Sequence, residues 1–302
     1  MSIIVARDVP LSESDGLTVR RTLPTRGRSF VGAWCFVDHF GPNAVDPDHG
    51  MFVRPHPHTG LQTVSWLFTG EIEHRDSAGN HTLIKRGELN LMTAGRGISH
   101  SEMSTTNATT LHGVQLWVAL PDQARFTEPT FAHYVPEPVI KNGVTSRVFL
   151  GSLLGQTSPV NTFTPLVGAQ LDLEAGVRLE LPLDTAFEYG LLLDDGELLI
   201  DGEPLTQHAL ALRAVGTATV VLEARTAVRL LVLGGTPIGE EIVMWWNYIG
   251  RSHDEVKQFH EQWLAEVAGT ASETQFGWPI GDDQPAEVAP PFPALTLKPR
   301  GN

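Results

Sequence analysis

The chain has 302 residues and a formal net charge of −14, with 21 lysines and arginines against 35 aspartates and glutamates. This balance argues against a nucleic-acid-binding surface, because phosphate contacts require clustered basic side chains. The length is enough for two domains of ordinary size. The sequence offers a single cysteine and no apolar stretch of signal-peptide or membrane-spanning length, so it predicts a cytoplasmic protein without a disulfide.

Two regions of the chain have the character of β structure. From residue 17 to about 120, short apolar runs rich in strand-favouring residues alternate with Gly, Pro, Asn and Asp. A second region of the same kind runs from about 146 to 235 and contains hairpin signals such as Asp201-Gly202. The pattern predicts two consecutive all-β domains, over residues 1–145 and 146–302.

One helix is predicted, over residues 253–267. Ser252 can cap its start, and Glu255 completes an S-x-x-E capping box. Four apolar side chains share one face at three- and four-residue steps: Val256, Phe259, Trp263 and Val267. We expect this face to pack on a β domain, and residues 270–302, which are rich in proline, to form an extended tail.

Two short pairs of residues carry the chemistry. His56 and His58 stand at positions i and i+2, and alternate side chains of a strand share a face, so both imidazoles can reach one point. His100 and Glu102 repeat this spacing with an imidazole and a carboxylate. Two such pairs on neighbouring strands predict a single metal site. Mixed nitrogen and oxygen donors suit Fe, Mn, Co, Ni, Cu or Zn, whereas structural zinc is usually closed by cysteines.

Several neighbouring residues admit two interpretations. Pro55 and Pro57 cannot donate ladder hydrogen bonds, so their strand should be an edge or bulged strand. His39 lies either near the metal or in a purely structural position. Three apolar side chains either line a substrate pocket or belong to the core, which is commoner for barrel strands: Trp66, Phe68 and Met92. The remaining candidate histidines have no partner at ligand spacing and are predicted not to bind the metal: His74, His112, His133 and His208.

Glycines flank the two pairs in a characteristic order. The pattern G-x5-HxH-x11-G, followed by G-x5-TxG-x4-H, resembles the two motifs of the cupin superfamily. The acid usual in the first motif is missing, because Gln62 or Thr63 stands there, and Glu102 can take its place. The stretches HPHTGLQTVSWLFTGEIEHRDSAGN and MTAGRGISHSEM closely resemble the pirin family of bicupins, as do GVQLWVALP, TPIGEEIVM and the proline-rich end.

The resemblance implies an all-β bicupin fold of two double-stranded β-helix (jelly-roll) barrels. The first domain, 1–145, is expected to bind the metal, and the second, 146–302, to be metal-free and to carry the helix and the tail. One divalent metal per chain is implied, Fe(II) first, with Zn, Mn, Ni, Co and Cu as alternatives. Its implied ligands are His56, His58, His100 and Glu102.

The resemblance also implies an activity, that of a quercetin 2,3-dioxygenase. A flavonol or related enol or aromatic substrate is expected to react with O2 after Glu102 accepts its hydroxyl proton, which makes Glu102 the catalytic residue. The alternative is a non-catalytic regulatory protein that senses metal or redox state and binds a protein partner. A monomer is expected, without nucleic-acid or membrane binding.

Two further expectations concern the surroundings of the metal. Family members often carry Glu where this chain has Gln62, so we expect the exchange to remove a charge close to the metal. A ligating imidazole must be neutral, so we expect metal affinity to weaken as the pH falls through about 6.5, the ordinary pKa of histidine.

Overall fold

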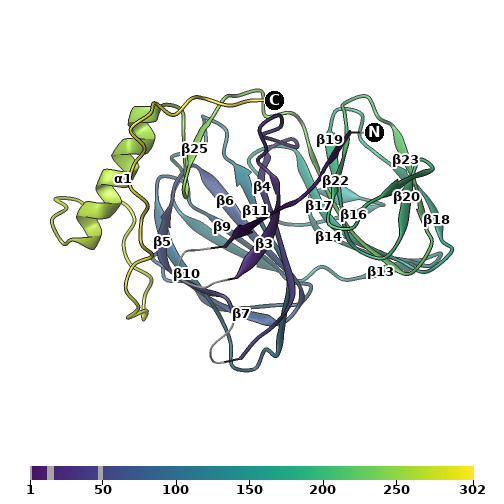
Figure 1. Ribbon diagram of the computed structural model, residues 1–302, viewed down its shortest axis with the longest axis horizontal. Helices are drawn as coiled ribbons and strands as arrows, with labels where there is room; N and C mark the ends of the chain where they lie inside the picture. Colours follow the sequence, from purple (N-terminus) through teal and green to yellow (C-terminus); the bar gives the residue numbers. More distant parts are fainter. Residues whose placement is uncertain (1, 12–16, 47–49) are drawn as a thin grey trace.

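The protein is built from two β barrels placed side by side (Figure 1). The computed structural model describes residues 2–11, 17–46 and 50–302. Residues 1, 12–16 and 47–49, which fall in the predicted first domain, lie outside the described residues. Each barrel consists of a seven-stranded sheet facing a four-stranded sheet, and one helix, α1 (His253–Val267), lies on the outer flank of the first barrel. The all-β bicupin prediction is confirmed.

The first barrel forms from antiparallel strands between residues 7 and 134. Its seven-stranded sheet has the order β12 (Thr130–Tyr134), β9 (Leu89–Thr93), β6 (Leu61–Thr69), β11 (Thr110–Ala119), β4 (Trp34–Ala44), β3 (Thr18–Leu23) and β2 (Arg7–Pro10). Its four-stranded sheet has the order β5 (Phe52–His58), β10 (Ile98–Ser104), β7 (Glu71–Asp76) and β8 (His81–Lys85).

The second barrel repeats this plan with one borrowed strand. Its larger sheet has the order β1 (Ser2–Ile4), β22 (Leu210–Arg213), β19 (Glu188–Asp195), β24 (Val228–Gly235), β17 (Leu166–Leu173), β14 (Val144–Leu150) and β13 (Val139–Lys141). Its smaller sheet has the order β18 (Arg178–Pro182), β23 (Thr219–Ala224), β20 (Leu198–Ile200) and β21 (Glu203–Leu205). Two hairpins complete the β structure: β15 (Ser152–Leu153) with β16 (Gln156–Thr157), and β25 (Val243–Trp245) with β26 (Tyr248–Gly250).

The two seven-stranded sheets share one apolar core between the barrels. Trp66 of β6 stacks on Phe149 of β14, with ring centroids 4.5 Å apart. Its indole N–H donates to Gln170 of β17 at 2.8 Å, and the indole N–H of Trp34 is shared between backbone carbonyls of β17 and β24 at 3.2 Å each. Because these buried N–H groups find partners across the interface, the relative position of the barrels is specified by directional bonds as well as by apolar packing.

Helix α1 begins at the predicted residue. Ser252 accepts a hydrogen bond from the N–H of Glu255, while the Glu255 carboxylate accepts from the N–H of Arg251 rather than of Ser252. Three of the four predicted apolar residues are buried: Val256, Phe259 and Trp263. The prediction was wrong for Val267, which is 45% exposed because the helix ends there, and His260 completes the buried face instead.

The ends of the chain cross to the opposite barrel. Strand β1 pairs with β22 of the second barrel. Helix α1 and residues 268–302, which the sequence groups with the second domain, instead lie against the first barrel (Figure 1). The backbone N–H of Glu287 donates to the carbonyl of Pro55 at 2.8 Å, and that of Ser99 donates to the carbonyl of Phe276 at 3.2 Å. The tail is extended, as predicted, and it covers the strands that carry the histidine pairs.

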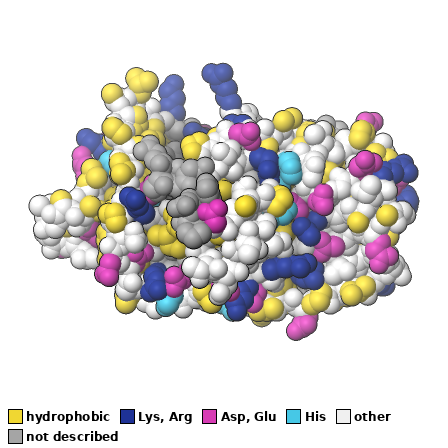
Figure 2. Space-filling model, turned by 60° about the horizontal axis from the view of Figure 1, so that its bottom comes forward, with side chains coloured by type: hydrophobic (Ala, Val, Ile, Leu, Met, Phe, Trp, Pro, Cys, Tyr) yellow, Lys and Arg dark blue, Asp and Glu magenta, His cyan; other side chains and the backbone are white. Residues whose placement is uncertain are grey.

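On the face shown in Figure 2, Lys and Arg side chains lie among Asp and Glu. Within the described parts of the chain, no helix combines the length and the apolar character that crossing a membrane requires.

We expect Phe149→Ala to lower the free energy of unfolding by roughly 3–5 kcal/mol, because it removes a fully buried ring from the core between the barrels. Urea denaturation followed by tryptophan fluorescence measures the change. Phe163→Ala, at a residue 40% exposed, serves as the control and should change stability by less than about 0.5 kcal/mol. Equal effects of the two substitutions would contradict this description of the interface.

Candidate metal centre

Pairing of β5 with β10 brings the two predicted ligand pairs together. The strands are antiparallel, with His100 opposite His56 and Ile98 opposite His58. A register shift between His100 and Glu102 marks an irregularity in this pairing. Strand β5 lies at the edge of its sheet, which confirms the expectation drawn from its two prolines.

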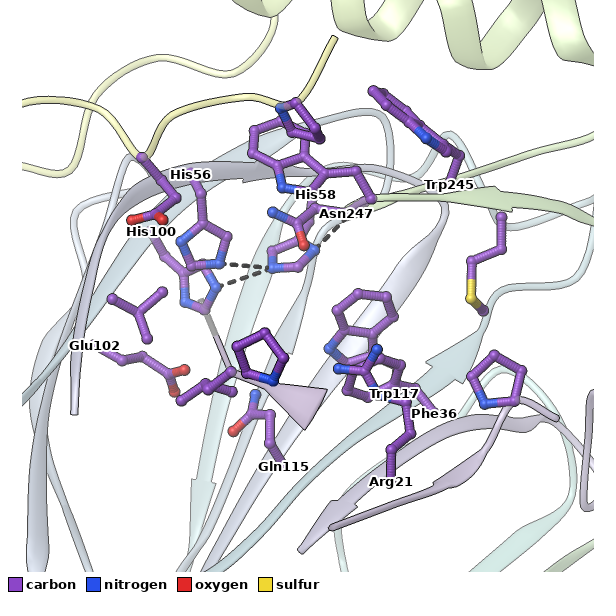
Figure 3. Close-up of a pocket in the computed structure, with 18 of the residues that line it drawn as sticks. Arg21, Phe36, His56, His58, His100, Glu102, Gln115, Trp117, Trp245 and Asn247 are labelled. Carbon is purple, nitrogen blue, oxygen red and sulfur yellow. Dashed lines mark hydrogen bonds between the residues drawn. The ribbon is translucent and has the colours of Figure 1, made fainter. Parts of the chain in front are cut away.

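Three imidazoles converge at this point of the barrel (Figure 3). The Nε2 atom of His58 lies 3.1 Å from the Nε2 atom of His56 and 3.1 Å from that of His100. All three rings are buried, with exposed fractions of 6%, 1% and 1% for His56, His58 and His100. The ligand atoms of these residues all lie within 4.8 Å of one another.

The opposite nitrogens of the rings determine what the centre can bind. Nδ1 of His56 faces the carbonyl of Arg54 at 2.8 Å, and Nδ1 of His58 faces the carbonyl of Asn247 at 3.1 Å. A carbonyl only accepts, so each Nδ1 carries the proton, and each Nε2 turns a lone pair toward the centre. Lone pairs that face one another at 3.1 Å repel unless a cation lies between them. The residues present therefore fit a divalent metal bound by imidazole nitrogen.

His74 supports the centre from behind. Its Nδ1 lies 3.4 Å from Nδ1 of His100, and its Nε2 lies 3.1 Å from the carboxylate of Asp76. Both residues come from β7, which pairs with β10. A carboxylate that orients one histidine, which in turn orients a second, is a common support for metal-binding imidazoles. The sequence prediction missed this contact because it considered only ligand spacing along the chain.

Glu102 lies beside the three nitrogens but outside their group. A carboxylate oxygen of Glu102 lies within 4.8 Å of ring nitrogens of His100 and His74. Glu102 also lines the same cavity as the three histidines. Ser65 donates to Glu102 at 3.0 Å and contacts the Gln115 amide at 2.9 Å. A hydroxyl has one hydrogen, so Ser65 serves one of its two acceptors at a time, the Glu102 carboxylate or Oε1 of Gln115. Burial raises the pKa of Glu102, against the opposing effects of His74 and the Ser65 hydroxyl.

The histidines open into a cavity of about 420 Å³ with aromatic walls. Phe36 and Trp117 stack with ring centroids 4.1 Å apart, and the Arg21 guanidinium lies 4.2 Å from the Phe36 centroid. Trp245 and Trp246 line the same cavity. Trp245 is labelled in Figure 3. The wall thus combines strands of the first barrel with a hairpin that follows the second. Alternation along β11 could have placed Trp117 in the cavity. Val114, Leu116 and Val118 face the core between the barrels, so Trp117 points to the other face of the strand, toward the barrel interior.

Gln62 corrects an expectation from the sequence. Its side chain donates to Thr93 at 2.9 Å, and on β6 it shares a face with Val64 and Trp66, which belong to the core between the barrels. Ser65, on the other face of β6, is the residue that reaches Glu102. The expectation that the exchange to Gln62 removes a charge close to the metal was therefore wrong.

The other candidate residues lie away from this cavity. Three are core residues: Trp66, Phe68 and Met92. His133 hydrogen-bonds to Asn90 through Nδ1 at 2.9 Å. His39 and His112 lie together between the barrels, and the ring of His208 packs against His39 with centroids 4.8 Å apart.

Protonation of the three histidines is suppressed in the folded protein. Burial lowers the pKa of His56 to about 4, and burial together with the neighbouring imidazoles lowers the pKa of His58 and His100 further below the ordinary value. These shifts move the expected loss of metal affinity in the folded protein from about pH 6.5 to a lower pH, and the weakening at acid pH stays a prediction.

A pair of jelly-roll barrels, with a histidine cluster and a buried carboxylate inside the first, defines a bicupin. The sequence matches the Pirin family over residues 16–118 and the Pirin C-terminal cupin domain over residues 168–268. This chain belongs to the pirin family.

Relatives of the chain carry two kinds of name. A Pseudomonas aeruginosa protein named "Putative quercetin 2,3-dioxygenase" is 41% identical over 279 residues, covering 92% of this chain and 87% of that protein. A pirin-like protein of Caulobacter vibrioides is 37% identical over 256 residues, covering 82% of this chain and 88% of that protein.

Solved structures agree with the fold. The crystal structure of a quercetin 2,3-dioxygenase from Acinetobacter baumannii is 36% identical, covers 99% of this chain and 97% of its own, and has a TM-score of 0.91. The nickel(II) complex of a bacterial pirin from Escherichia coli is 16% identical, covers 78% of this chain and 99% of its own, and has a TM-score of 0.61, which supports the fold alone.

We expect His74→Ala to weaken metal binding about 10- to 100-fold, because His100 loses the group that orients it. Competition of the purified protein with a chelator of known affinity measures the change. His133→Ala removes a histidine distant from the centre and should bind metal like the unaltered protein. Unchanged affinity in both variants would exclude a supporting role for His74.

The metal-free protein should lose stability as the pH falls from about 6.5 to about 4. In that window the unfolded imidazoles take up protons that the buried ones do not, and the contribution of His56 levels off below its folded pKa of about 4. The shift of His56 alone corresponds to roughly 3 kcal/mol. Urea denaturation at several pH values tests this. His56→Gln should flatten the slope, whereas His133→Ala should not, and equal slopes in all three proteins would contradict the prediction.

Proposed function

We propose that this protein is a metal-dependent dioxygenase of the quercetin 2,3-dioxygenase type, which acts on a flavonol or a related aromatic enol. The observation that carries the proposal is the convergence of three neutral imidazole Nε2 atoms beside a buried carboxylate, inside a cavity with aromatic walls. The names of the Pseudomonas and Acinetobacter relatives support the same reaction class.

The proposed metal is Fe(II), held by His56, His58, His100 and Glu102. When bound, it supplies charge stabilisation and electrons for the reaction with O2. The arrangement of ligands supports iron because nitrogen and carboxylate donors suit it, and the same donors also accept Mn, Co, Ni, Cu or Zn. If the bound ion takes six ligands, four protein ligands would leave positions for small molecules.

The cavity walls bind and orient the substrate in this proposal. The face of Trp117, stacked on Phe36, offers a flat apolar surface for a planar ring system, and Trp245 and Trp246 line the same cavity. Burial of the substrate among these rings keeps water from the reacting carbon atoms. The Arg21 guanidinium is held by two hydrogen bonds to Asp38, at 2.6 and 2.7 Å, so it fixes the position of Phe36 beneath it.

Glu102 accepts the hydroxyl proton of the substrate. Its raised pKa makes it a stronger base than an exposed carboxylate, and the hydrogen bond from Ser65 holds the accepting group in place. The enolate that remains is the electron-rich form that reacts with O2. Glu102 completes the ligand set at rest and takes the proton when the substrate enters.

The regulatory alternative uses the same centre differently. In this alternative the protein catalyses no reaction. The bound metal changes the shape of the protein surface, and a protein partner binds according to the metal or redox state. The extended tail over the cavity offers such a surface, since Glu287, Val288 and Pro290 form part of the cavity wall. Bound metal without turnover of any flavonol or catechol would favour this alternative.

Protein purified without oxygen and loaded with Fe(II) should consume O2 when quercetin is added. His56→Ala should abolish the uptake, because one of the converging imidazoles is lost. Glu102→Gln should lower kcat about 10²- to 10⁴-fold, because the amide cannot accept the proton. An oxygen electrode together with metal analysis measures both effects.

Glu180→Gln makes the same chemical change on the second barrel, where the side chain is 63% exposed, and should leave turnover unaltered. Full turnover by Glu102→Gln would remove Glu102 from the reaction. Full turnover by His56→Ala would overturn the proposed site altogether.

A further inference from the structure

A second group of ligand-type side chains lies between the barrels, outside the cavity described above. His39 of β4, His112 of β11 and Asp194 of β19 form this inter-barrel cluster. Nε2 of His39 and Nε2 of His112 lie 3.3 Å apart, and each lies 2.7 Å from Oδ1 of Asp194. His39 and Asp194 are fully buried and His112 is 9% exposed. Two imidazoles of one barrel and a carboxylate of the other thus meet at one point.

We propose that the inter-barrel cluster is a second metal site, which binds a zinc(II) ion through His39, His112 and Asp194. Two nitrogens bound to zinc at roughly 2.0–2.1 Å and at a tetrahedral angle lie about 3.3 Å apart, which is the separation of the two Nε2 atoms here. Oδ1 of Asp194 lies 2.7 Å from each nitrogen, so it needs to move outward by about 0.7 Å to reach the same tetrahedral spacing. The fourth position of the ion goes to water or to the neighbouring His208.

The protonation states suit metal binding. Burial lowers the pKa of His39, which keeps its ring in the neutral form that metals require. Burial acts to raise the pKa of Asp194, but hydrogen bonds from His112 and His39 outweigh it and hold the pKa well below the usual range. The cluster therefore presents the neutral nitrogen of His39 and the anionic oxygen of Asp194.

The carboxylate is also held from its other side. Oδ2 of Asp194 accepts from Arg229 at 3.1 Å, and Arg229 is itself bonded to Asp172 at 3.3 Å. Carboxylates that bind metals are commonly fixed by such a bond, which here leaves Oδ1 for the ion. The charges of Arg229 and of nearby Arg20 oppose a cation, so this site should bind more weakly than the three-histidine centre and fill after it.

Without a metal, both imidazoles can donate Nε2–H to Oδ1 of Asp194. Nδ1 of His39 has no hydrogen-bond partner among the described residues in either state, so it does not distinguish the two states. Nδ1 of His208 also has no partner among the described residues, and unpaired buried nitrogens of this kind often border a bound ion or water.

The test counts bound ions and does not depend on turnover. Full-length protein is stripped with a chelator at neutral pH and titrated with zinc(II), with binding followed by calorimetry and by metal analysis after desalting. We expect two equivalents for the unaltered protein, bound in two steps. Asp194→Asn keeps the size of the side chain, and His112→Asn, made separately, keeps a polar side chain. Each should bind one equivalent, with the weaker step missing.

Two controls separate the sites from each other and from misfolding. The triple variant His56→Ala, His58→Ala, His100→Ala should still bind one equivalent, and zinc should raise its thermal unfolding midpoint. His133→Ala should bind two. One equivalent in the unaltered protein, or two in a folded Asp194→Asn variant, overturns the proposal. Two bound equivalents of zinc, together with no quercetin turnover by the Fe(II)-loaded protein, would refute the proposed function and leave this site standing.

Discussion

The register between β5 and β10 is the constraint on which the metal centre depends. It places His100 opposite His56, so residues 44 positions apart in the sequence share one face of the sheet. A slip of one residue would turn the imidazoles of one strand to the other face and separate the nitrogens. The edge position of β5 and the irregularity beside Glu102 both fall at this pairing. The pairing of these two strands therefore determines whether the imidazoles can meet at one point.

The second barrel contributes to the first without holding a comparable centre among its described residues. Its interior is filled by apolar side chains of both its sheets. Its outer face supplies Gln170 to the indole of Trp66 and Asp194 to His39 and His112. The chain that leaves it supplies the Asn247 carbonyl that orients His58. The duplicated barrel therefore works as a support that aligns groups of its neighbour.

Local patterns predicted the parts of the molecule that depend on local geometry. The pairs His56 and His58, and His100 and Glu102, were recognisable because alternation along a strand puts both members on one face. Helix α1 was recognisable from its cap and its period. Val267 was misplaced because the period does not say where the helix meets solvent.

Contacts between distant segments escaped prediction. His74 contacts His100 on the neighbouring strand, and Asp194 of the second barrel contacts His39 of the first. Neither contact can be predicted from the spacing of residues along the chain. Gln62 was misjudged because a motif position gives a residue's place along a strand but not the side to which it points. The aromatic walls combine Trp117 with Trp245, which are separated in the sequence by the strands β13 to β24 of the second barrel.

The exchange of chain ends between the barrels limits how the protein can be divided. A fragment ending after β12 would lack Trp245, Asn247 and the tail that encloses the cavity, and it would expose the core that now faces Phe149. A fragment starting at β13 would lose β1 from the edge of its larger sheet. Although the two barrels look like separate domains, each depends on a terminal segment that crosses from the other half of the chain. A truncated or circularly permuted form must therefore retain both terminal segments.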